Sequence, residues 1–311
     1  RDTSFVLMMG NAIQATIARS RDQADVGMNL PWAFYDMGLF YFLTGRPYES
    51  LAAYAKAIQS SSNSWMIKTS LDTFNKLNVV RNALVGYEWA RRLFLIGLAV
   101  NFPTTNDGKL EEVKKLALTR YEQIRGPVVI MVGGCDISLG QQVQGYRELL
   151  LAAFRDFKGT VISCGITEGV SGLIGDIQQE CPGTIKTIGY IPQLIPPSTV
   201  IDKRYGEIRY TEGTGFSALE PLQKWIDLIA SGVDPGQVKI LGIGGGIIEA
   251  IEYRIALALG ASVGVIKGSG YEVEKLLLDD DWNASKKLAP LPANPLIAKA
   301  FIGPGRSELP R

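Results

Sequence analysis

Hydrophobic and polar positions follow two different spacings along the chain. Up to about residue 122, apolar residues recur every three or four positions, as in "WAFYDMGLFYFLTGRPYESLAAYAKAIQ" and "ALVGYEWARRLFLIGLAV". This spacing is typical of amphipathic helices, which bury one face and expose the other. We therefore expect residues 1–122 to form an all-α domain.

The first of these segments places a Gly-Arg-Pro turn between two faces of helical period. Gly38, Tyr41, Gly45 and Tyr48 stand near the positions that mark a tetratricopeptide repeat, so the segment resembles one. The match is loose, with an extra residue after the turn, and a single repeat cannot bury its own apolar face. The alternatives are a tetratricopeptide-like scaffold and a plain helical bundle.

From Gly126 onward, short apolar runs alternate with segments of helical period. The runs are "GPVVIMVGG", "GTVISCG", "TIKTIGYIP", "QVKILGIGGG" and "SVGVIKGSG". Continuously apolar strands that alternate with helices are typical of a parallel sheet covered on both faces. The sequence predicts an α/β domain over residues 123–311, a Rossmann-like open parallel sheet with helices on both faces. We expect the Pro-rich segment after Trp282 to wrap this domain.

The composition excludes several classes of function. The chain has 32 basic and 31 acidic residues and no basic tract, so nothing indicates a nucleic-acid partner. Histidine is absent, which removes the commonest general base, the commonest metal ligand and every Ser-His-Asp or Cys-His nucleophile. The longest apolar stretches are shorter than the roughly 20 residues of a membrane helix, so we expect no membrane association within this segment.

Three cysteines, Cys135, Cys164 and Cys181, are too few and too irregularly spaced for a disulfide framework or a zinc ribbon. We expect them to be reduced, in a cytoplasmic protein. Cys135 is interpreted as a small buried residue, because no base accompanies its thiol. The chain begins at Arg1 rather than at Met, so we expect it to be part of a longer protein.

Four of the five predicted strands end in glycine-rich turns, "VGGCD", "SCGITEG", "GIGGG" and "IKGSG". Ligands of open α/β sheets bind in the crevice outside the carboxyl ends of the strands. Such turns direct backbone N–H groups and helix N-termini at that crevice, which suits a phosphate. A tight strand-to-helix connection remains the alternative for any one turn.

The predicted ligand-binding residues come from these four turns and the helix starts that follow them: Gly133, Gly134, Asp136, Thr167, Glu168, Gly169, Gly244, Gly245, Gly246, Glu249, Lys267, Gly268 and Ser269. Glycine lets a phosphate or ribose approach the backbone closely, because no Cβ intervenes. Asp136 either accepts ribose hydroxyls or caps the next helix. Lys267 is either a phosphate counter-charge or a surface lysine.

The remaining polar residues of the turns have two interpretations each. Glu168 either contacts an adenine amine or a ribose, or is an ordinary carboxylate in a first helical turn. Glu249 lies one turn into its helix and faces either ligand or solvent. The hydroxyls of Thr167 and Ser269 are suited to bind phosphate through hydrogen bonds.

Two other charged segments have less specific interpretations. Arg204 and Arg209 fall in the polar segment "DKRYGEIRYTEGTGF", where solvated loop charge is the first interpretation and closure over the crevice the second. The acidic run "DDDW" at 279–282 is interpreted as solvated rather than as a metal site. We expect no metal and no resident cofactor.

The fingerprints of dehydrogenases and P-loop hydrolases do not fit. In "GIGGGI" the pattern G-x-G-x-x-G would need glycine at position 247, where the chain has Ile247. In "GVIKGSG" the lysine precedes the glycine, so the Walker pattern is absent. Hydride transfer and nucleoside-triphosphate hydrolysis are therefore disfavoured.

Three segments in this order, "GPVVIMVGGCDISL", "GTVISCGITEGVSGLIGDI" and "VKILGIGGGIIEAIEYRIALALGASVGVIKGSGYEV", resemble the SLOG superfamily. The resemblance covers roughly residues 126–291 and favours the LSDAT type, found in prokaryotic proteins and in the N-terminal region of melastatin-type TRP channels. It implies a Rossmann-like sensor of nucleotides such as ADP-ribose, cyclic ADP-ribose or NAD-derived messengers. It also implies bacterial signalling or anti-phage defence, often beside tetratricopeptide-like regions.

The sequence departs from the LOG branch, whose phosphoribohydrolases carry "P-G-G-x-G-T-x-x-E", because it has "G-I-G-G-G-I-I-E-A" instead. This departure favours a sensor without enzymatic activity, which signals through a second copy of the chain or an effector protein. The first alternative is a nucleotide N-glycosidase or phosphoribohydrolase that uses Glu168, Glu249 or Asp136. A ligand-free interaction module is the second alternative.

Overall fold

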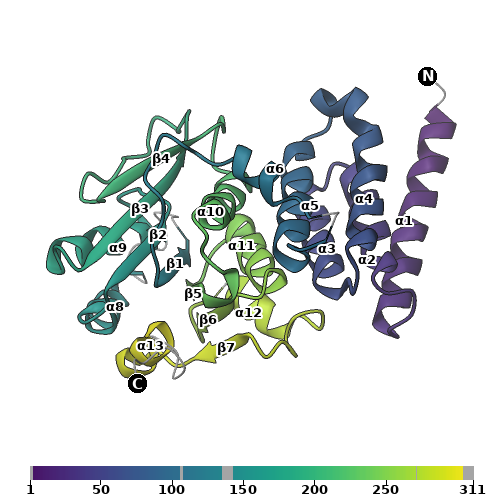
Figure 1. The fold of residues 1–311 in the computed structure, drawn as a ribbon. Coiled ribbons are helices and arrows are strands. Elements are labelled where there is room, and N and C mark those ends of the chain that lie inside the picture. Colours follow the sequence, from purple (N-terminus) through teal and green to yellow (C-terminus); the bar gives the residue numbers. More distant parts are fainter. Residues whose placement is uncertain (1–2, 106–107, 135–142, 271, 304–311) are drawn as a thin grey trace. The chain divides into compact units, whose positions relative to one another are not determined.

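The computed structural model describes residues 3–105, 108–134, 143–270 and 272–303. The chain divides into two compact units, residues 1–115 and 116–311, which are described separately (Figure 1). Residues 116–125 belong to the second unit through hydrogen bonds: the Leu118 N–H donates to Asp227 Oδ1 (3.0 Å), and the Ile124 N–H donates to Ser231 Oγ (2.9 Å). Among the described residues, no helix combines the length and the apolar character needed to cross a membrane.

The first unit is helical, as the apolar spacing predicts. It comprises α1 (Thr3–Asp25), α2 (Trp32–Leu43), α3 (Pro47–Ser60), α4 (Ser64–Asn75), the 3-10 helix η1 (Lys76–Ala83), α5 (Tyr87–Asn101) and α6 (Leu110–Lys115). The core is aromatic, with ring centroids 4.7 Å apart for Tyr54 and Phe94 and 4.9 Å apart for Phe42 and Phe74.

Gly38 sets the close packing of α2 on α3. A Cβ at this position would lie 2.4 Å from the Tyr54 ring, so only glycine lets the ring lie against the α2 backbone. The Ser50 hydroxyl donates to the Gly38 carbonyl oxygen at 2.7 Å and joins the same two helices. In the turn between them, Gly45 has a φ of +75°, a conformation that favours glycine.

The second unit is the predicted α/β fold, with one parallel sheet of seven strands. The strands are β1 (Val128–Gly133), β2 (Gly159–Ser163), β3 (Ile185–Pro192), β4 (Glu207–Thr211), β5 (Lys239–Ile243), β6 (Ser262–Ile266) and β7 (Leu288–Leu291). Their order across the sheet is β4-β3-β2-β1-β5-β6-β7. The five predicted apolar runs supply the five inner strands, which have neighbours on both sides and pack against helices on both faces.

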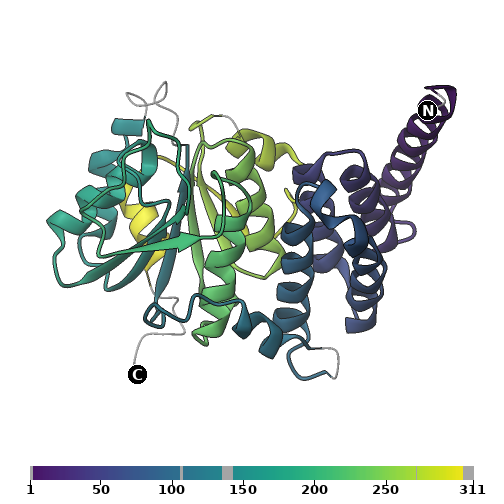
Figure 2. The ribbon, with the colours of Figure 1, turned by 90° about the horizontal axis from the view of Figure 1, so that it is seen from above.

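Helices cover both faces of the sheet. They are α8 (Arg147–Phe154), α9 (Gly169–Glu180), α10 (Leu219–Ala230), η3 (Pro235–Gln237), α11 (Ile247–Ala258), α12 (Glu272–Leu278) and α13 (Pro295–Ile302). Figure 2 shows α8, α9 and α13 on one face and α10, α11 and α12 on the other. Buried Val129, Met131 and Val161 of the sheet share one hydrophobic core with Leu173 and Ile174 of α9.

The sequence analysis missed both edge strands. β4 reads "EIRYT" and β7 reads "LAPL", and neither is the continuous apolar run that marks an inner strand. Pro290 lies within β7, a position that an edge strand tolerates because its free side needs no N–H donor. The Pro-rich segment after Trp282 forms β7 and α13, a strand and a helix that the sequence analysis did not predict.

The interpretation of Arg204 and Arg209 as solvated loop charges was also wrong. The side chain of Arg209, on β4, is 2% exposed; its Nη1 lies 2.9 Å from Asp227 Oδ2, and its Nε lies 2.6 Å from Glu207 Oε1. Arg204 forms ion pairs with Asp202 and Asp176. Both guanidinium groups bind carboxylates of this unit, which argues against the alternative that they close over a crevice.

Candidate functional site

The strand order places a topological switch point between β1 and β5. The chain leaves β1 toward β2 on one side, while β5 lies on the other side, and Gly133 at the end of β1 pairs with Ile243 at the end of β5. The carboxyl ends of β2, β1, β5 and β6 are consecutive along this edge. Ligands of open α/β sheets bind outside a switch point, and the carboxyl end of β1 and the turns after β2, β5 and β6 lie along this edge.

The turn after β5 is built from glycines with unusual backbone angles. Gly244 has a φ of +62° and Gly245 a φ of +111°, and Gly246 precedes the first residue of α11. The Gly244 N–H donates to Ser269 Oγ at 2.9 Å, and the Ser269 hydroxyl donates to the Ile266 carbonyl oxygen at 2.6 Å. Ser269 is buried and joins the turns after β5 and β6, so its hydroxyl proton is already used inside the protein.

Glu249 closes the N-terminus of α11. Its Oε2 accepts a hydrogen bond from the Gly246 N–H at 2.7 Å. Burial raises the pKa of Glu249, and the hydrogen bond from Gly246 opposes that rise. A carboxylate held against a helix N-terminus is stabilised by the unpaired N–H groups there. In this arrangement Glu249 occupies the place that an anionic ligand would take.

The turn from β2 to α9 holds an unsatisfied carboxylate. Glu168 is the N-cap residue of α9, and its Oε2 is buried without a hydrogen-bond partner among the described residues. A buried acceptor left unpaired costs about 1–3 kcal/mol, which a ligand hydroxyl or amine would recover. Beside it, the Thr167 N–H and hydroxyl both donate to the Val200 carbonyl oxygen, at 3.0 and 3.4 Å. Gly169 begins α9 with a φ of +59°.

Gly133 has a packing role that the sequence analysis did not foresee. A Cβ there would lie 2.4 Å from Val170 Cγ2 and 2.6 Å from the Ile243 carbonyl oxygen. Its small size therefore lets β1 approach both β5 and α9. The Gly134 carbonyl oxygen accepts from the Val170 N–H at 3.4 Å. Asp136 and Cys135 lie outside the described residues.

The turn after β6 exposes Lys267, the basic residue predicted to bind phosphate, to solvent. The Lys267 side chain is exposed, while its backbone N–H donates to the Leu291 carbonyl oxygen at 2.8 Å. Gly268 has a φ of +81°, and its N–H donates to Glu274 Oε1 at 2.8 Å. The ammonium group of Lys267 is thus free to move toward an anion at this edge of the sheet.

A buried ion pair between α10 and α11 was missed by the sequence analysis. Lys224 Nζ lies 2.7 Å from Glu252 Oε1, and the two side chains are 2% and 5% exposed. Burial lowers the pKa of Lys224, but the nearby Glu252 and Glu220 carboxylates and the Cys164 thiol outweigh burial and raise it overall. The sequence contained little indication of this pair, because a lysine in a segment of helical period is usually solvated. Only the packing of α10 against α11 buries it.

Two cavities of the second unit lie away from these turns. The larger, about 820 Å³, is lined by residues at the amino ends of β1, β2 and β3, including Arg125, Thr160 and Lys186. The smaller, about 280 Å³, is lined by residues 117–120 and by residues at the carboxyl ends of β3 and β4. Neither includes a predicted site residue. Within the described ranges, no group of three or more Cys, Asp or Glu residues is placed to hold a metal ion.

No family model matches this chain, and no curated protein matches it either. Among solved structures, it is similar to the structural-genomics target TM1055, with 20% identity, a TM-score of 0.41, and coverage of 56% of this chain and 97% of that one. It is also similar to the molybdenum cofactor carrier protein of Chlamydomonas reinhardtii, with 19% identity, a TM-score of 0.41, and coverage of 57% and 96%. These likenesses assign neither a ligand nor an activity to this chain.

Proposed function

We propose that the α/β unit is a nucleotide sensor of the SLOG superfamily, of LSDAT type. It binds an adenine-nucleotide messenger, such as ADP-ribose, cyclic ADP-ribose or an NAD-derived nucleotide, at the carboxyl ends of β2, β1, β5 and β6. The observation that carries this proposal is the switch point, where Gly133 pairs with Ile243 and the turn containing Gly244 and Gly245 follows.

The polar groups at this edge suit the two ends of such a ligand. The exposed Lys267 ammonium suits phosphates. The unpaired Oε2 of Glu168 suits a ribose hydroxyl or an adenine amine, both of which are donors. A nucleotide carries both kinds of group, whereas inorganic phosphate carries only the first.

The helical unit completes the proposal as a tetratricopeptide-like scaffold. Its α2–α3 pair carries the glycines and tyrosines of the resemblance, with the Gly38 backbone held against the Tyr54 ring. Binding of the nucleotide orders the glycine turns and changes the association of the chain with a second copy or an effector protein. Such a device belongs to bacterial signalling or anti-phage defence.

The proposal is tested by calorimetric titration of the full chain with ADP-ribose, cyclic ADP-ribose, NAD and AMP, paired with chromatography of the products. We expect at least one of them to bind without being consumed. Glu168→Gln and Lys267→Ala are each expected to weaken binding by at least tenfold, since a hydrogen bond to a charged group contributes roughly 1.5–3 kcal/mol. The absence of binding for all four nucleotides would refute the proposal.

Two matched variants keep the titration specific. Glu180→Gln removes an exposed carboxylate at the opposite end of α9. Lys286→Ala removes an exposed lysine that precedes the amino end of β7, away from the carboxyl ends of the strands. Both are expected to bind as the unchanged chain does. Equal weakening by Glu180→Gln and Glu168→Gln would point to a general charge effect instead of a site.

A second candidate function is hydrolysis of a nucleotide N-glycosidic bond. The unpaired carboxylate oxygen of Glu168 favours it, because such a reaction needs a carboxylate that is not already neutralised or bound. Glu249 suits this role less well, since its Oε2 already accepts from the Gly246 N–H. Release of ribose phosphate in the same chromatograms, lost in Glu168→Gln, would replace the sensor with the enzyme.

A further inference from the structure

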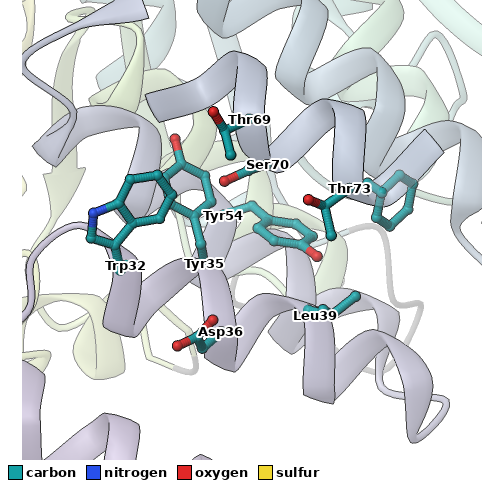
Figure 3. A pocket seen from close by; sticks show the side chains of 9 residues that line it. Trp32, Tyr35, Asp36, Leu39, Tyr54, Thr69, Ser70 and Thr73 are labelled. Atoms are coloured by element: carbon teal, nitrogen blue, oxygen red, sulfur yellow. The ribbon is translucent and has the colours of Figure 1, made fainter. Parts of the chain in front are cut away.

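A cavity of about 110 Å³ opens in the helical unit between α2 and α4 (Figure 3). Trp32, Tyr35 and Asp36 line it from α2, where spacings of three and four residues bring them to one helix face. Tyr54 of α3 also lines it (Figure 3). A cavity of this volume holds several water molecules or one small ligand head group.

Aromatic side chains line this cavity, and among Trp32, Tyr35 and Tyr54 only Trp32 is partly exposed. The centroids of Trp32 and Tyr35 are 5.8 Å apart and those of Tyr35 and Tyr54 are 6.4 Å apart, with the planes inclined by 48° and 42°. Tyr35 and Tyr54 are buried in the core of the unit, so their positions are held by packing before any ligand arrives. The faces of such rings carry negative charge density and attract cations.

Asp36 supplies the one formal charge among the residues that line the cavity. Its carboxylate lies at the exposed rim and has no ion-pair partner within the described part of the chain. Partial burial raises the pKa of Asp36 above its ordinary value. Burial also raises the pKa values of Tyr35 and Tyr54 far above the usual range, so both phenols stay neutral. The cavity is therefore acidic and has no cation of its own.

The third side of the cavity presents hydroxyl groups from α4. The Ser70 hydroxyl donates to the Met66 carbonyl oxygen at 3.2 Å, so its lone pairs are what remain for a ligand. Thr69 and Thr73 line the same side and carry the same kind of group (Figure 3). The carboxylate, the hydroxyl oxygens and the Trp32 ring together suit a ligand that is positively charged.

We propose that this cavity binds a small organic ammonium head group, with the cation against the partly exposed Trp32 ring and beside the Asp36 carboxylate, above the buried Tyr35 and Tyr54. The group is either part of a free small molecule or the end of a modified lysine side chain. The rings disfavour a hydrated metal ion, which would exchange its water for apolar surface. The site is independent of the nucleotide site proposed above, since every residue that lines it belongs to the helical unit.

The test is calorimetric titration of the full chain with tetramethylammonium chloride and with choline, followed also by tryptophan fluorescence. The neutral isostere 3,3-dimethylbutanol has the shape of choline without its charge. We expect both cations to bind and the alcohol to bind at least tenfold more weakly. Equal binding of choline and the alcohol, or no binding of either cation, would overturn the proposal.

Matched variants separate the cavity from the rest of the unit. Asp36→Asn is expected to weaken choline binding by tenfold or more, whereas Asp72→Asn, an exposed carboxylate on α4 outside the cavity, leaves it unchanged. Trp32→Leu is expected to abolish binding, and Trp89→Leu, whose indole packs on Tyr48, to retain it. Full affinity in both Asp36→Asn and Trp32→Leu would contradict the assignment.

Two measurements keep the result interpretable. Trp32→Phe keeps a ring face and is expected to bind choline more weakly than the unchanged chain but better than Trp32→Leu. The Asp36→Asn chain is expected to unfold at the same temperature as the unchanged chain, because the carboxylate is exposed at the rim.

A trimethyllysine peptide that binds at least tenfold tighter than choline identifies a protein partner, and weaker or equal binding identifies a small molecule.

Discussion

The ion pair between Lys224 and Glu252 provides the sharpest test of the packing inside the α/β unit. Lys224→Met removes the cation and leaves the Glu252 carboxylate buried without its partner. At the observed 2.7 Å separation, an effective dielectric constant of about 20 gives a gross attraction of about 6 kcal/mol. Desolvation of both groups offsets part of that attraction. Breaking a buried pair from one side costs about 3–5 kcal/mol, and we expect a loss in this range.

Replacement of both partners separates the cost of the orphaned charge from the cost of lost packing. In Lys224→Met/Glu252→Leu no charge stays buried, so most of the lost stability is expected to return. The control is Lys275→Met on α12, because Lys275 pairs with Glu272 at 2.6 Å but its side chain is 71% exposed. An exposed pair contributes roughly 0–1 kcal/mol, so this variant is expected to unfold close to the unchanged chain.

The assay is equilibrium unfolding in urea, followed by tryptophan fluorescence and near-ultraviolet circular dichroism. Trp225 neighbours Lys224 on α10 and is fully buried, so the transition that exposes it reports on the α/β unit. With the single variant Glu252→Leu added, the unfolding free energies of the unchanged chain, the two single variants and the double variant form a double-mutant cycle. A loss below about 1 kcal/mol in Lys224→Met, or a double variant no more stable than the single one, would refute the reasoning.

Three further substitutions test other contacts, each measured by urea unfolding. Partial burial alone would raise the pKa of Glu207, but its ion pairs with two basic neighbours outweigh burial and lower it. Its stabilising effect is therefore full above pH 4.5 and is lost as the pH falls through the lowered folded-state pKa. Glu207→Gln is expected to make the free energy of unfolding fall less steeply at acid pH, and an unchanged fall would contradict this. Gly133→Ala is expected to cost about 1–3 kcal/mol, because its Cβ would lie 2.4 Å from Val170, and wild-type stability would disprove that contact. Gly38→Ala gains about 1 kcal/mol of helix propensity but meets the Tyr54 ring at 2.4 Å, so a net loss is expected, and a gain would count against the packing described.

Much of the fold could be predicted from the sequence because the signals are local. A helix of 3.6 residues per turn imposes its period on every amphipathic segment, which is why the helical first unit was foreseen. Inner strands of a parallel sheet are buried on both faces and read as unbroken apolar runs, as in "GPVVIM" and "QVKILG". The turns at the ends of these runs could be predicted because their glycines are a local signal as well. Gly244 and Gly245 have backbone angles that other residues rarely adopt.

The edge strands and the state of each charge depended on the tertiary structure. β4 carries Arg209, and nothing near it in sequence reveals that Asp227, on α10, will neutralise it inside the protein. The hydroxyl of Ser269 and the carboxylate of Glu249 were identified as polar groups near a crevice, but only the folded chain shows that they already serve Gly244 and Gly246. The sequence does not distinguish Glu168 from these two residues. Only the folded chain shows that its Oε2 has no hydrogen-bond partner among the described residues.

The same division holds for the cavity of the helical unit. The sequence determined that Trp32, Tyr35 and Asp36 share one face of a helix, because their spacing matches the helical period. Whether that face is buried, solvated or hollow depends on the packing of three helices that are separate in the chain. Tyr54 and the hydroxyls of α4 reach the cavity only when α3 and α4 fold against α2. Local spacing thus determines which residues stand together on an element, and long-range packing decides what they face.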